Sequence, residues 1–112
     1  MIVADIVKAL NLEVLSGAKG LQREVTSGYT SDLLSDVMGF ADAGAAWVTL
    51  QTHKNVMAVA SLKELGAIIL VKGFKPEPDT IEQSDEEEIP ILGTELSAFE
   101  ITGKLYNMLQ QE

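Results

Sequence analysis

The sequence predicts a three-layer α/β/α domain built on a mainly parallel sheet. From residue 46 onward, apolar strand-like runs alternate with helix-like segments, and the run at 67–71 is continuously apolar. Such a run is typical of a parallel strand buried on both faces. Alternating strands and helices predict right-handed crossovers with helices on both faces of the sheet. The 112 residues are 46% hydrophobic and 22% charged, which indicates one globular domain over 1–112.

The N-terminal part predicts a helix followed by a short extended piece. Apolar residues recur at helical spacing over 1–10. Residues 13–16 are extended and stop at Gly17, and 18–20 form a turn. The extended pieces of the first half are expected to add strands to the sheet.

A second strand and a short helix follow. Residues 24–30 are rich in Thr, Val and Tyr, which predicts a strand that contains Gly28. A glycine inside a strand often marks a bulge or a close backbone approach. Ser31 or Asp32 is then predicted to cap a helix over 33–40.

The middle of the chain is more regular. Residues 46–51 predict a strand and 55–65 a helix. Gly66 follows in the position where glycine commonly ends a helix. The buried strand at 67–71 comes next.

The last third repeats this order. Pro76 and Pro78 open a helix that extends to about residue 88. A short strand at 89–92 and a final helix over 97–111 complete the predicted fold.

Composition excludes several classes of function. The chain has no cysteine, so disulfides, thiolate metal sites and thiol catalysis are absent. Its net charge of −9 argues against nucleic acids and anionic membranes as partners, because both require basic surface. No apolar run is long enough to cross a bilayer. Asp5 and Lys8 interrupt the apolar N-terminus, so it predicts a helix and not a secretion signal, and we expect a cytoplasmic protein.

The usual catalytic motifs are missing. The sequence contains no G-x-x-x-x-G-K-[ST] phosphate loop, no G-x-G-x-x-G, no G-x-S-x-G and no zinc-hydrolase helix motif. We therefore predict a protein that is not an enzyme, with no catalytic residues, no metal site and no cofactor.

Three loops are expected to meet at one edge of the sheet. Residues 52–55, 72–74 and 93–97 each follow a predicted strand, and ligands of open parallel sheets bind beyond the carboxyl ends of the strands. Free backbone N–H groups at helix N-termini suit an anionic ligand. The predicted ligand-binding residues are Thr52, His53, Asn55, Lys72, Gly73, Thr94 and Ser97.

A structural alternative stays open for these residues. Asn55 and Ser97 are suited to cap the helices that follow them. Thr52 and Thr94 are suited to satisfy the backbone of their own loops. Under this alternative the edge holds no ligand.

A second alternative is a small phosphotransfer or hydrolytic enzyme. His53 is the only histidine of the chain, and a general base needs an orienting carboxylate. Asp32 and Asp36 are four residues apart on the predicted helix and are the candidates for that carboxylate. This hypothesis requires His53 within hydrogen-bond reach of one of them.

Several ordered segments together resemble the DRTGG domain family. These segments are LEVLSG at 12–17, REVTSGYTSDLLSDV at 23–37, QTHKNV at 51–56 and TELSAFE at 94–100. The resemblance covers nearly the whole chain. In the Asp-Arg…Thr-Gly-Gly signature, Arg23, Thr26 and Gly28 are kept. Gln22 stands in place of the Asp, and Ser27 stands in place of the first Gly, so this chain lacks the signature's acidic residue.

The resemblance implies a fold like the N-terminal domain of HPr kinase/phosphorylase, which is not the catalytic part of that enzyme. Similar domains are accessory parts of some phosphate acetyltransferases and of CBS-domain pyrophosphatases. In the latter, the resemblance implies dimer contacts within a nucleotide-responsive regulatory region.

The leading hypothesis is a non-catalytic regulatory or ligand-sensing module that forms a homodimer. Its expected ligand is a small anionic metabolite or nucleotide, and a protein partner stays open. The expected dimer contact is Gly28, Tyr29 and Thr30, since tyrosine brings a large area with a polar tip. The alternative for Tyr29 is an ordinary strand residue that covers the core. A purely structural dimerisation domain without ligand is a further alternative.

Overall fold

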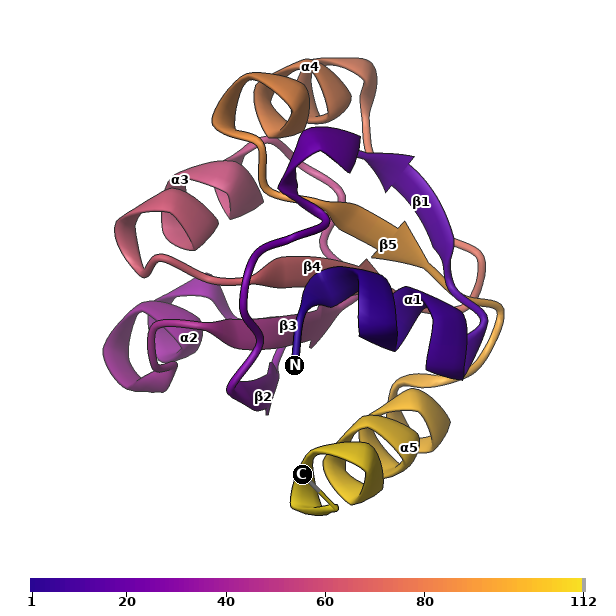
Figure 1. Ribbon diagram of the computed structural model, residues 1–112. Helices are drawn as coiled ribbons and strands as arrows, with labels where there is room; N and C mark the ends of the chain where they lie inside the picture. Colours follow the sequence, from indigo (N-terminus) through magenta and orange to yellow (C-terminus); the bar gives the residue numbers. More distant parts are fainter. Residues whose placement is uncertain (112) are drawn as a thin grey trace.

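The computed structural model describes residues 1–111 and shows a sheet between two layers of helices (Figure 1). The helices are α1 (Val3–Leu10), α2 (Leu34–Phe40), α3 (Asn55–Leu62), α4 (Pro78–Glu87) and α5 (Ala98–Gln110), with a 3-10 turn at Ala18–Gly20. The strands are β1 (Glu13–Ser16), β2 (Ser27–Thr30), β3 (Ala45–Thr49), β4 (Ala67–Leu70) and β5 (Ile91–Gly93). The elements follow the order that the sequence predicts.

The five strands lie in the order β1-β5-β4-β3-β2. The four strands from β2 to β5 are parallel, and their register places Trp47 beside Tyr29 on one side and beside Ile68 on the other. β1 runs antiparallel to β5 and pairs Val14 with Leu92. The predicted mainly parallel sheet is therefore confirmed, with β1 and β2 as its two edges.

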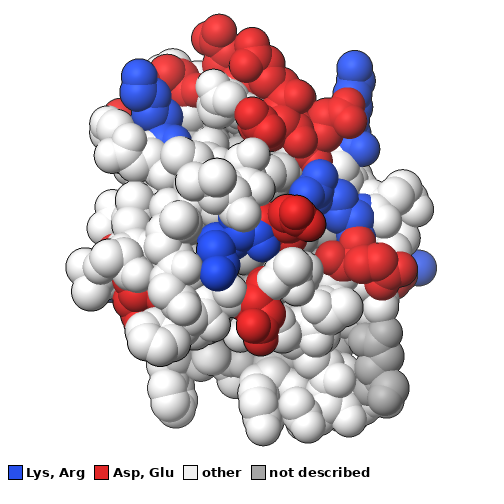
Figure 2. All heavy atoms as spheres, turned by 90° about the vertical axis from the view of Figure 1, so that its left-hand side faces the viewer, with Lys and Arg blue, Asp and Glu red and all other residues white. Residues whose placement is uncertain are grey.

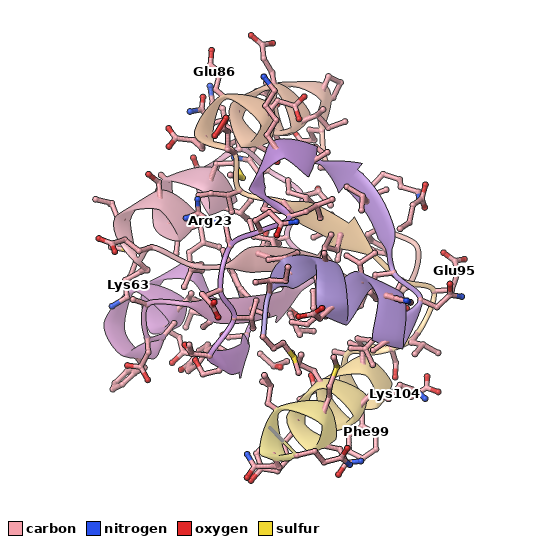
Figure 3. All side chains as sticks on the ribbon, viewed as in Figure 1. Arg23, Lys63, Glu86, Glu95, Phe99 and Lys104 are labelled. Carbon is pink, nitrogen blue, oxygen red and sulfur yellow. The ribbon has the colours of Figure 1, made fainter. Side chains whose placement is uncertain are left out.

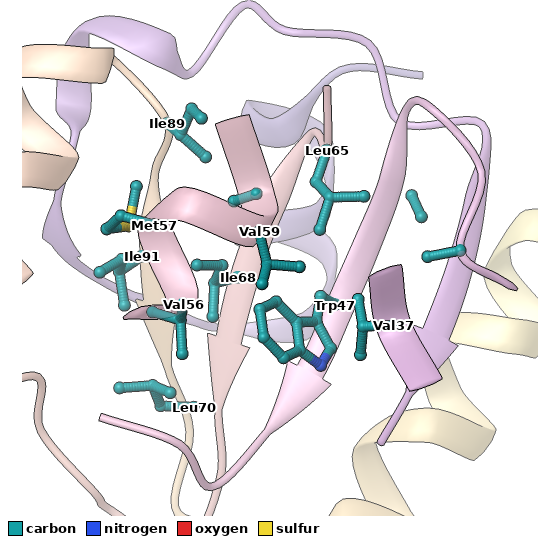
Figure 4. Packing of buried hydrophobic residues seen from close by; sticks show 13 residues of the cluster. Val37, Trp47, Val56, Met57, Val59, Leu65, Ile68, Leu70, Ile89 and Ile91 are labelled. Atoms are coloured by element: carbon teal, nitrogen blue, oxygen red, sulfur yellow. The ribbon is translucent and has the colours of Figure 1, made fainter. Parts of the chain in front are cut away.

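Successive residues of each central strand serve opposite cores, as the period of two in a strand requires. Trp47 and Ile68 pack with residues of α2 and α3 on one face, which Figure 4 shows at close range. Val48 and Ile69 pack with α1 and α5 on the other face. The continuous apolar runs follow from burial on both faces. Trp47 is fully buried, and its indole N–H donates to the carbonyl oxygen of Ser31 over 2.7 Å.

The start of α2 differs from the sequence-based prediction. Leu33, and neither Ser31 nor Asp32, occupies the N-cap position, and no side chain caps the helix. Oδ1 of Asp32 instead accepts from the hydroxyl of Thr49 and the backbone N–H of Leu50, both at 2.8 Å. The prediction failed because Asp32 finds two donors at the end of the neighbouring strand β3.

The end of α3 also differs. The helix ends at Leu62, and Glu64, not Gly66, takes a left-handed conformation with φ of 54°. Gly66 is buried and donates to the carbonyl oxygen of Ala45 at 2.9 Å. A Cβ at this glycine would lie 2.8 Å from the carbonyl oxygen of Glu24. Gly66 is required by close backbone packing at the start of β4 and not by the helix end.

No helix within residues 1–111 combines the length and the apolar character needed to span a bilayer.

Candidate functional site

The loops after β4 and β5 are joined at the carboxyl edge of the sheet. The backbone N–H of Gly73 donates to the carbonyl oxygen of Thr94, and that of Lys72 donates to the carbonyl oxygen of Leu96, both at 2.9 Å. The structure therefore brings two of the three predicted loops together. Gly73 has a φ of 73°, in the left-handed region that favours glycine.

The loop after β3 is held by α4. The carbonyl oxygen of Thr52 accepts from the hydroxyl of Thr80 at 2.9 Å and from the backbone N–H of Glu77 at 3.1 Å. His53 is exposed, and its Nδ1 accepts from the backbone N–H of Asn55 at 3.1 Å. The histidine thus satisfies a backbone donor at the start of α3.

Ser97 and Thr94 make the contacts that the structural alternative expects. The hydroxyl of Ser97 accepts from the backbone N–H of Glu100, whose carboxylate accepts from the backbone N–H of Ser97, both at 3.2 Å. This reciprocal capping box fixes the first turn of α5. The hydroxyl of Thr94 accepts from the backbone N–H of Leu96 at 3.2 Å. Both side chains thus have structural partners within their own loop.

The hypothetical pair of His53 with a carboxylate is not formed. Asp32 binds Thr49 and Leu50, and Asp36 accepts from the hydroxyl of Tyr29. Within residues 1–111, no group of three or more His, Asp and Glu side chains is placed to hold a metal ion. The contact that the enzymatic alternative requires is therefore missing.

A groove of about 790 Å³ lies between the end of α1, the loop after β5 and α5. It is lined by Ala9, Leu10, Asn11, Glu13, Lys75, residues 93–96, Lys104, Asn107, Met108 and Gln111. Thr94 is the one predicted ligand residue in its lining. The α5 contribution was missed by sequence reasoning, although Lys104, Asn107 and Gln111 stand at helical spacing.

A smaller groove of about 410 Å³ lies between α3 and α4. Asn55, a predicted ligand residue, lines it together with Lys54, Gln83 and Glu87. The hydroxyl of Ser61 donates to the carboxylate of Glu87 across this groove at 3.3 Å. Two of the seven predicted ligand residues therefore line these two grooves, one in each, and the two grooves share no lining residue.

The predicted dimer contact lies on the free edge strand β2. Gly28 and Thr30 are exposed. Tyr29 is half-buried and packs against the core under α2, as the alternative for this residue expects. Burial, the hydrogen bond to Asp36 and the negative charge of that carboxylate raise the pKa of Tyr29 above its ordinary value.

Exposed apolar side chains lie on α2, at its N-cap and on α5, the two helices that are hydrogen-bonded to this strand. We call this surface the β2-edge face and define it by Gly28, Thr30, Leu33, Phe40, Phe99 and Tyr106. The exposed fractions of its four large side chains are 64% for Leu33, 73% for Phe40, 89% for Phe99 and 66% for Tyr106. The hydroxyls of Thr30 and Thr102 are 2.7 Å apart and join β2 to α5. Acidic side chains gather at the height of α4 in Figure 2, and the described residues in the lowest part of that view, at the height of α5, are all drawn in the white of uncharged residues.

Two of the kept signature residues, Arg23 and Thr26, precede β2 at the opposite, amino-terminal edge of the sheet. The guanidinium of Arg23 donates to the carbonyl oxygens of Leu65 and Glu88, each at 3.4 Å (Figure 3). The hydroxyl of Thr26 donates to the carbonyl oxygen of Ala43, also at 3.4 Å. These contacts tie the segment before β2 to the turns that precede β3, β4 and β5.

Residues 5–108 match the DRTGG domain family. The chain belongs to this family. The match covers nearly all of the described residues, and it confirms the resemblance that the sequence segments carry.

Two relatives of this DRTGG domain are HPr kinase/phosphorylases. The protein from Geobacillus sp. (strain WCH70) is 24% identical over 126 aligned residues, and that from Levilactobacillus brevis is 25% identical over 123. Each match covers 96% of this chain and 40% of the relative. The chain thus spans about two fifths of the length of these relatives.

A solved structure is also similar. It holds the CBS and DRTGG domains of the regulatory region of Clostridium perfringens pyrophosphatase, complexed with the activator diadenosine tetraphosphate. The TM-score is 0.71 at 15% sequence identity, over 91% of this chain and 44% of that one. The similarity confirms the α/β fold class.

Proposed function

We propose that this DRTGG domain is a non-catalytic regulatory module that forms a homodimer and binds a small anionic ligand. The uncharged, apolar β2-edge face is the observation that carries the proposal. A DRTGG domain within the regulatory region of another protein supports the regulatory part.

The negative net charge of the chain limits which surfaces can form a contact between two copies. Each copy carries a net charge of −9, so two copies repel each other unless their contact excludes the acidic surfaces. Side chains of the β2-edge face carry no charge, and α4 on the far side carries Asp79, Glu82 and the acidic run 85–87. A two-fold contact through the β2-edge face keeps the acidic helices apart.

The unpaired edge strand and the exposed aromatic side chains of this face suit a contact with an identical copy. β2 is an edge strand, so its outer backbone N–H and C=O groups are free to pair with another strand. Phe99 and Tyr106 stand two helical turns apart on α5 and offer aromatic anchors of the kind enriched in interfaces. A stable contact needs about 800 Å² from each partner. That is roughly one seventh of the 5832 Å² surface of this chain.

The dimer is tested by replacing Phe99 with Glu and measuring mass by native mass spectrometry and light scattering. We expect a dimer for the unchanged protein and a monomer for Phe99→Glu. Phe74→Glu is the matched control, since Phe74 is 45% exposed and follows β4 at the carboxyl edge. A monomeric unchanged protein, or equal dissociation of both variants, would refute the dimer.

The same mass spectra separate the regulatory proposal from a purely structural dimer. A dimer that carries additional mass after gentle purification supports a bound ligand. A bare dimer, also after addition of candidate anions at high concentration, supports the structural alternative.

A further inference from the structure

We propose that the groove between α1 and α5 binds a nucleoside phosphate, with Lys104 and Asn107 on the phosphate. This inference deepens the ligand part of the proposed function and rests on it. The groove has about 790 Å³, within the range of small-molecule sites, and combines an apolar floor with a few polar groups.

The wall formed by α5 is a row of hydrogen-bond donors. Lys104, Asn107 and Gln111 follow one another at intervals of three and four residues and all line the groove. Across residues 1–111 the ammonium group of Lys104 forms no ion pair. A lysine ammonium and side-chain amides are suitable donors for phosphate oxygens, and a charge-assisted hydrogen bond is about twice as strong as a neutral one.

The floor of the groove is apolar and half-buried. Leu10 of α1, Leu96 of the loop after β5 and Met108 of α5 contribute it. A flat purine or pyrimidine ring needs such a surface, and a methionine thioether makes favourable contacts with aromatic rings. A free inorganic phosphate would leave this floor uncovered.

The opposite wall supplies acceptors. Figure 3 shows Glu95 and Lys104 on the same side of the molecule, and both line the groove. The carboxylate of Glu95 lies beside Gly73, where a Cβ would come within 2.5 Å of it. Carboxylates accept from ribose hydroxyls in nucleotide sites of other α/β folds. Glu13, which also lines the groove, is neutralised by Lys75 at 3.0 Å.

Local charge favours this groove over the smaller groove between α3 and α4. Among the described residues that line the groove between α1 and α5, two lysines balance two glutamates, in a chain that carries nine excess negative charges. The smaller groove is bordered by the acidic helix α4 and contains a single lysine, Lys54. An anion is therefore repelled less between α1 and α5.

The test is calorimetric titration of the purified chain with adenosine 5′-diphosphate, adenosine and inorganic phosphate. We expect the diphosphate to bind more tightly than either fragment, because only the diphosphate engages both the floor and the α5 donors. Lys104→Gln is expected to weaken the diphosphate by about tenfold or more, as for loss of a hydrogen bond to a charged group. Lys54→Gln in the smaller groove is the matched control and should leave the affinity unchanged.

Asn107→Asp provides an independent variant, because it adds a carboxylate to the donor row at an exposed position where folding is not at stake. It should abolish binding while the unfolding temperature stays unchanged. The proposal is overturned by absence of binding up to about 1 mM diphosphate. It is also overturned by equal loss in Lys104→Gln and Lys54→Gln, or by phosphate alone binding as tightly as the diphosphate.

The Phe99→Glu variant separates this inference from the dimer. Phe99 does not line the groove, so a monomeric Phe99→Glu should still bind the diphosphate. If the monomeric variant binds the diphosphate, the groove is a binding site that does not depend on the dimer. If the protein is a dimer that does not bind the diphosphate, the dimer proposal is supported and the proposed binding site is refuted.

Discussion

The hydroxyl of Tyr29 donates a 2.9 Å hydrogen bond to Oδ1 of Asp36, and this contact joins the edge strand β2 to the helix that follows it. The tyrosine ring therefore turns toward the core under α2 and not outward from the strand. Of the three residues expected at a dimer contact, Gly28 and Thr30 are exposed, whereas Tyr29 is half-buried and packs against the core.

The titration of Tyr29 is a direct check of this contact. Burial and the adjacent Asp36 raise its pKa, so the folded state holds the proton more tightly than the unfolded state, whose tyrosine pKa is about 10. The resulting stability is fully present below about pH 10 and is lost as pH rises through the folded-state pKa. The tyrosinate absorbance of the native protein minus that of Tyr29→Phe should show a transition above about pH 10. A difference transition at or below the ordinary value would contradict the contact.

Two buried serines link β1 to α4. The hydroxyl of Ser16 donates to that of Ser84 at 2.8 Å, and the hydroxyl of Ser84 donates to the carbonyl oxygen of Ile89 at 2.7 Å. Ser84→Ala leaves Ser16 and Ile89 without these partners and should lower the free energy of unfolding by about 1–3 kcal/mol.

A double-mutant cycle in urea tests this link. Adding Ser16→Ala to Ser84→Ala should cost less than the sum of the two single changes, because the orphaned hydroxyl of Ser16 is removed as well. Strict additivity would show that the two hydroxyls do not depend on each other.

Arg23 is a kept signature residue, and its side chain connects two turns of the fold. Its guanidinium reaches the carbonyl oxygens of Leu65 and Glu88 at the same time. A lysine ammonium lacks the fixed fork that spans two acceptors. Arg23→Lys should therefore destabilise the fold by about 0.5–1.5 kcal/mol, as for a lost hydrogen bond.

Thermal or urea unfolding of Arg23→Lys measures this effect, with Lys19→Arg as control because Lys19 is exposed on the 3-10 turn. If Arg23→Lys is as stable as the unchanged protein but no longer binds ligand, the role of Arg23 is ligand binding. In that case its two hydrogen bonds to backbone carbonyl oxygens do not stabilise the fold.

Local sequence signals predicted what depends on neighbours in the chain. The N-cap at Ser97 and the proline at the first turn of α4 were predicted from residues within one helical turn. The alternation of strands and helices sufficed for the parallel sheet. Each of these predictions needs only the order of residue types along the chain.

Features that depend on distant residues were not predictable in this way. The role of Gly66 is set by the carbonyl oxygen of Glu24, and the groove on α5 exists because α1 and the loop after β5 lie beside it. Hydrophobic spacing predicts which face of a helix is buried, but it does not show which polar residues border a groove. The predicted ligand residues were therefore divided between two grooves and several structural contacts.

Asp32 illustrates the same distinction at the carboxyl edge. Its side chain was expected to cap α2 or to assist His53, and it instead fastens the end of β3 through Thr49 and Leu50. Its backbone oxygen also accepts from the side-chain amide of Gln51 at 2.8 Å. The hydrogen bonds of Asp32 thus connect the segment after β2 to the end of the neighbouring parallel strand β3.

Replacing Asp32 with Ala should lower the free energy of unfolding by about 1–3 kcal/mol, because the buried hydroxyl of Thr49 loses its carboxylate acceptor. Asp42→Ala is the matched control, since Asp42 is exposed in the turn before β3 and should change stability by less than about 0.5 kcal/mol. Urea unfolding of both variants gives the comparison. Asp32→Asn should retain part of the stability, because its amide oxygen still accepts one of the two donors. Equal stability of Asp32→Ala and Asp42→Ala would show that the Asp32 carboxylate is free for another role, and would reopen it as a partner for His53.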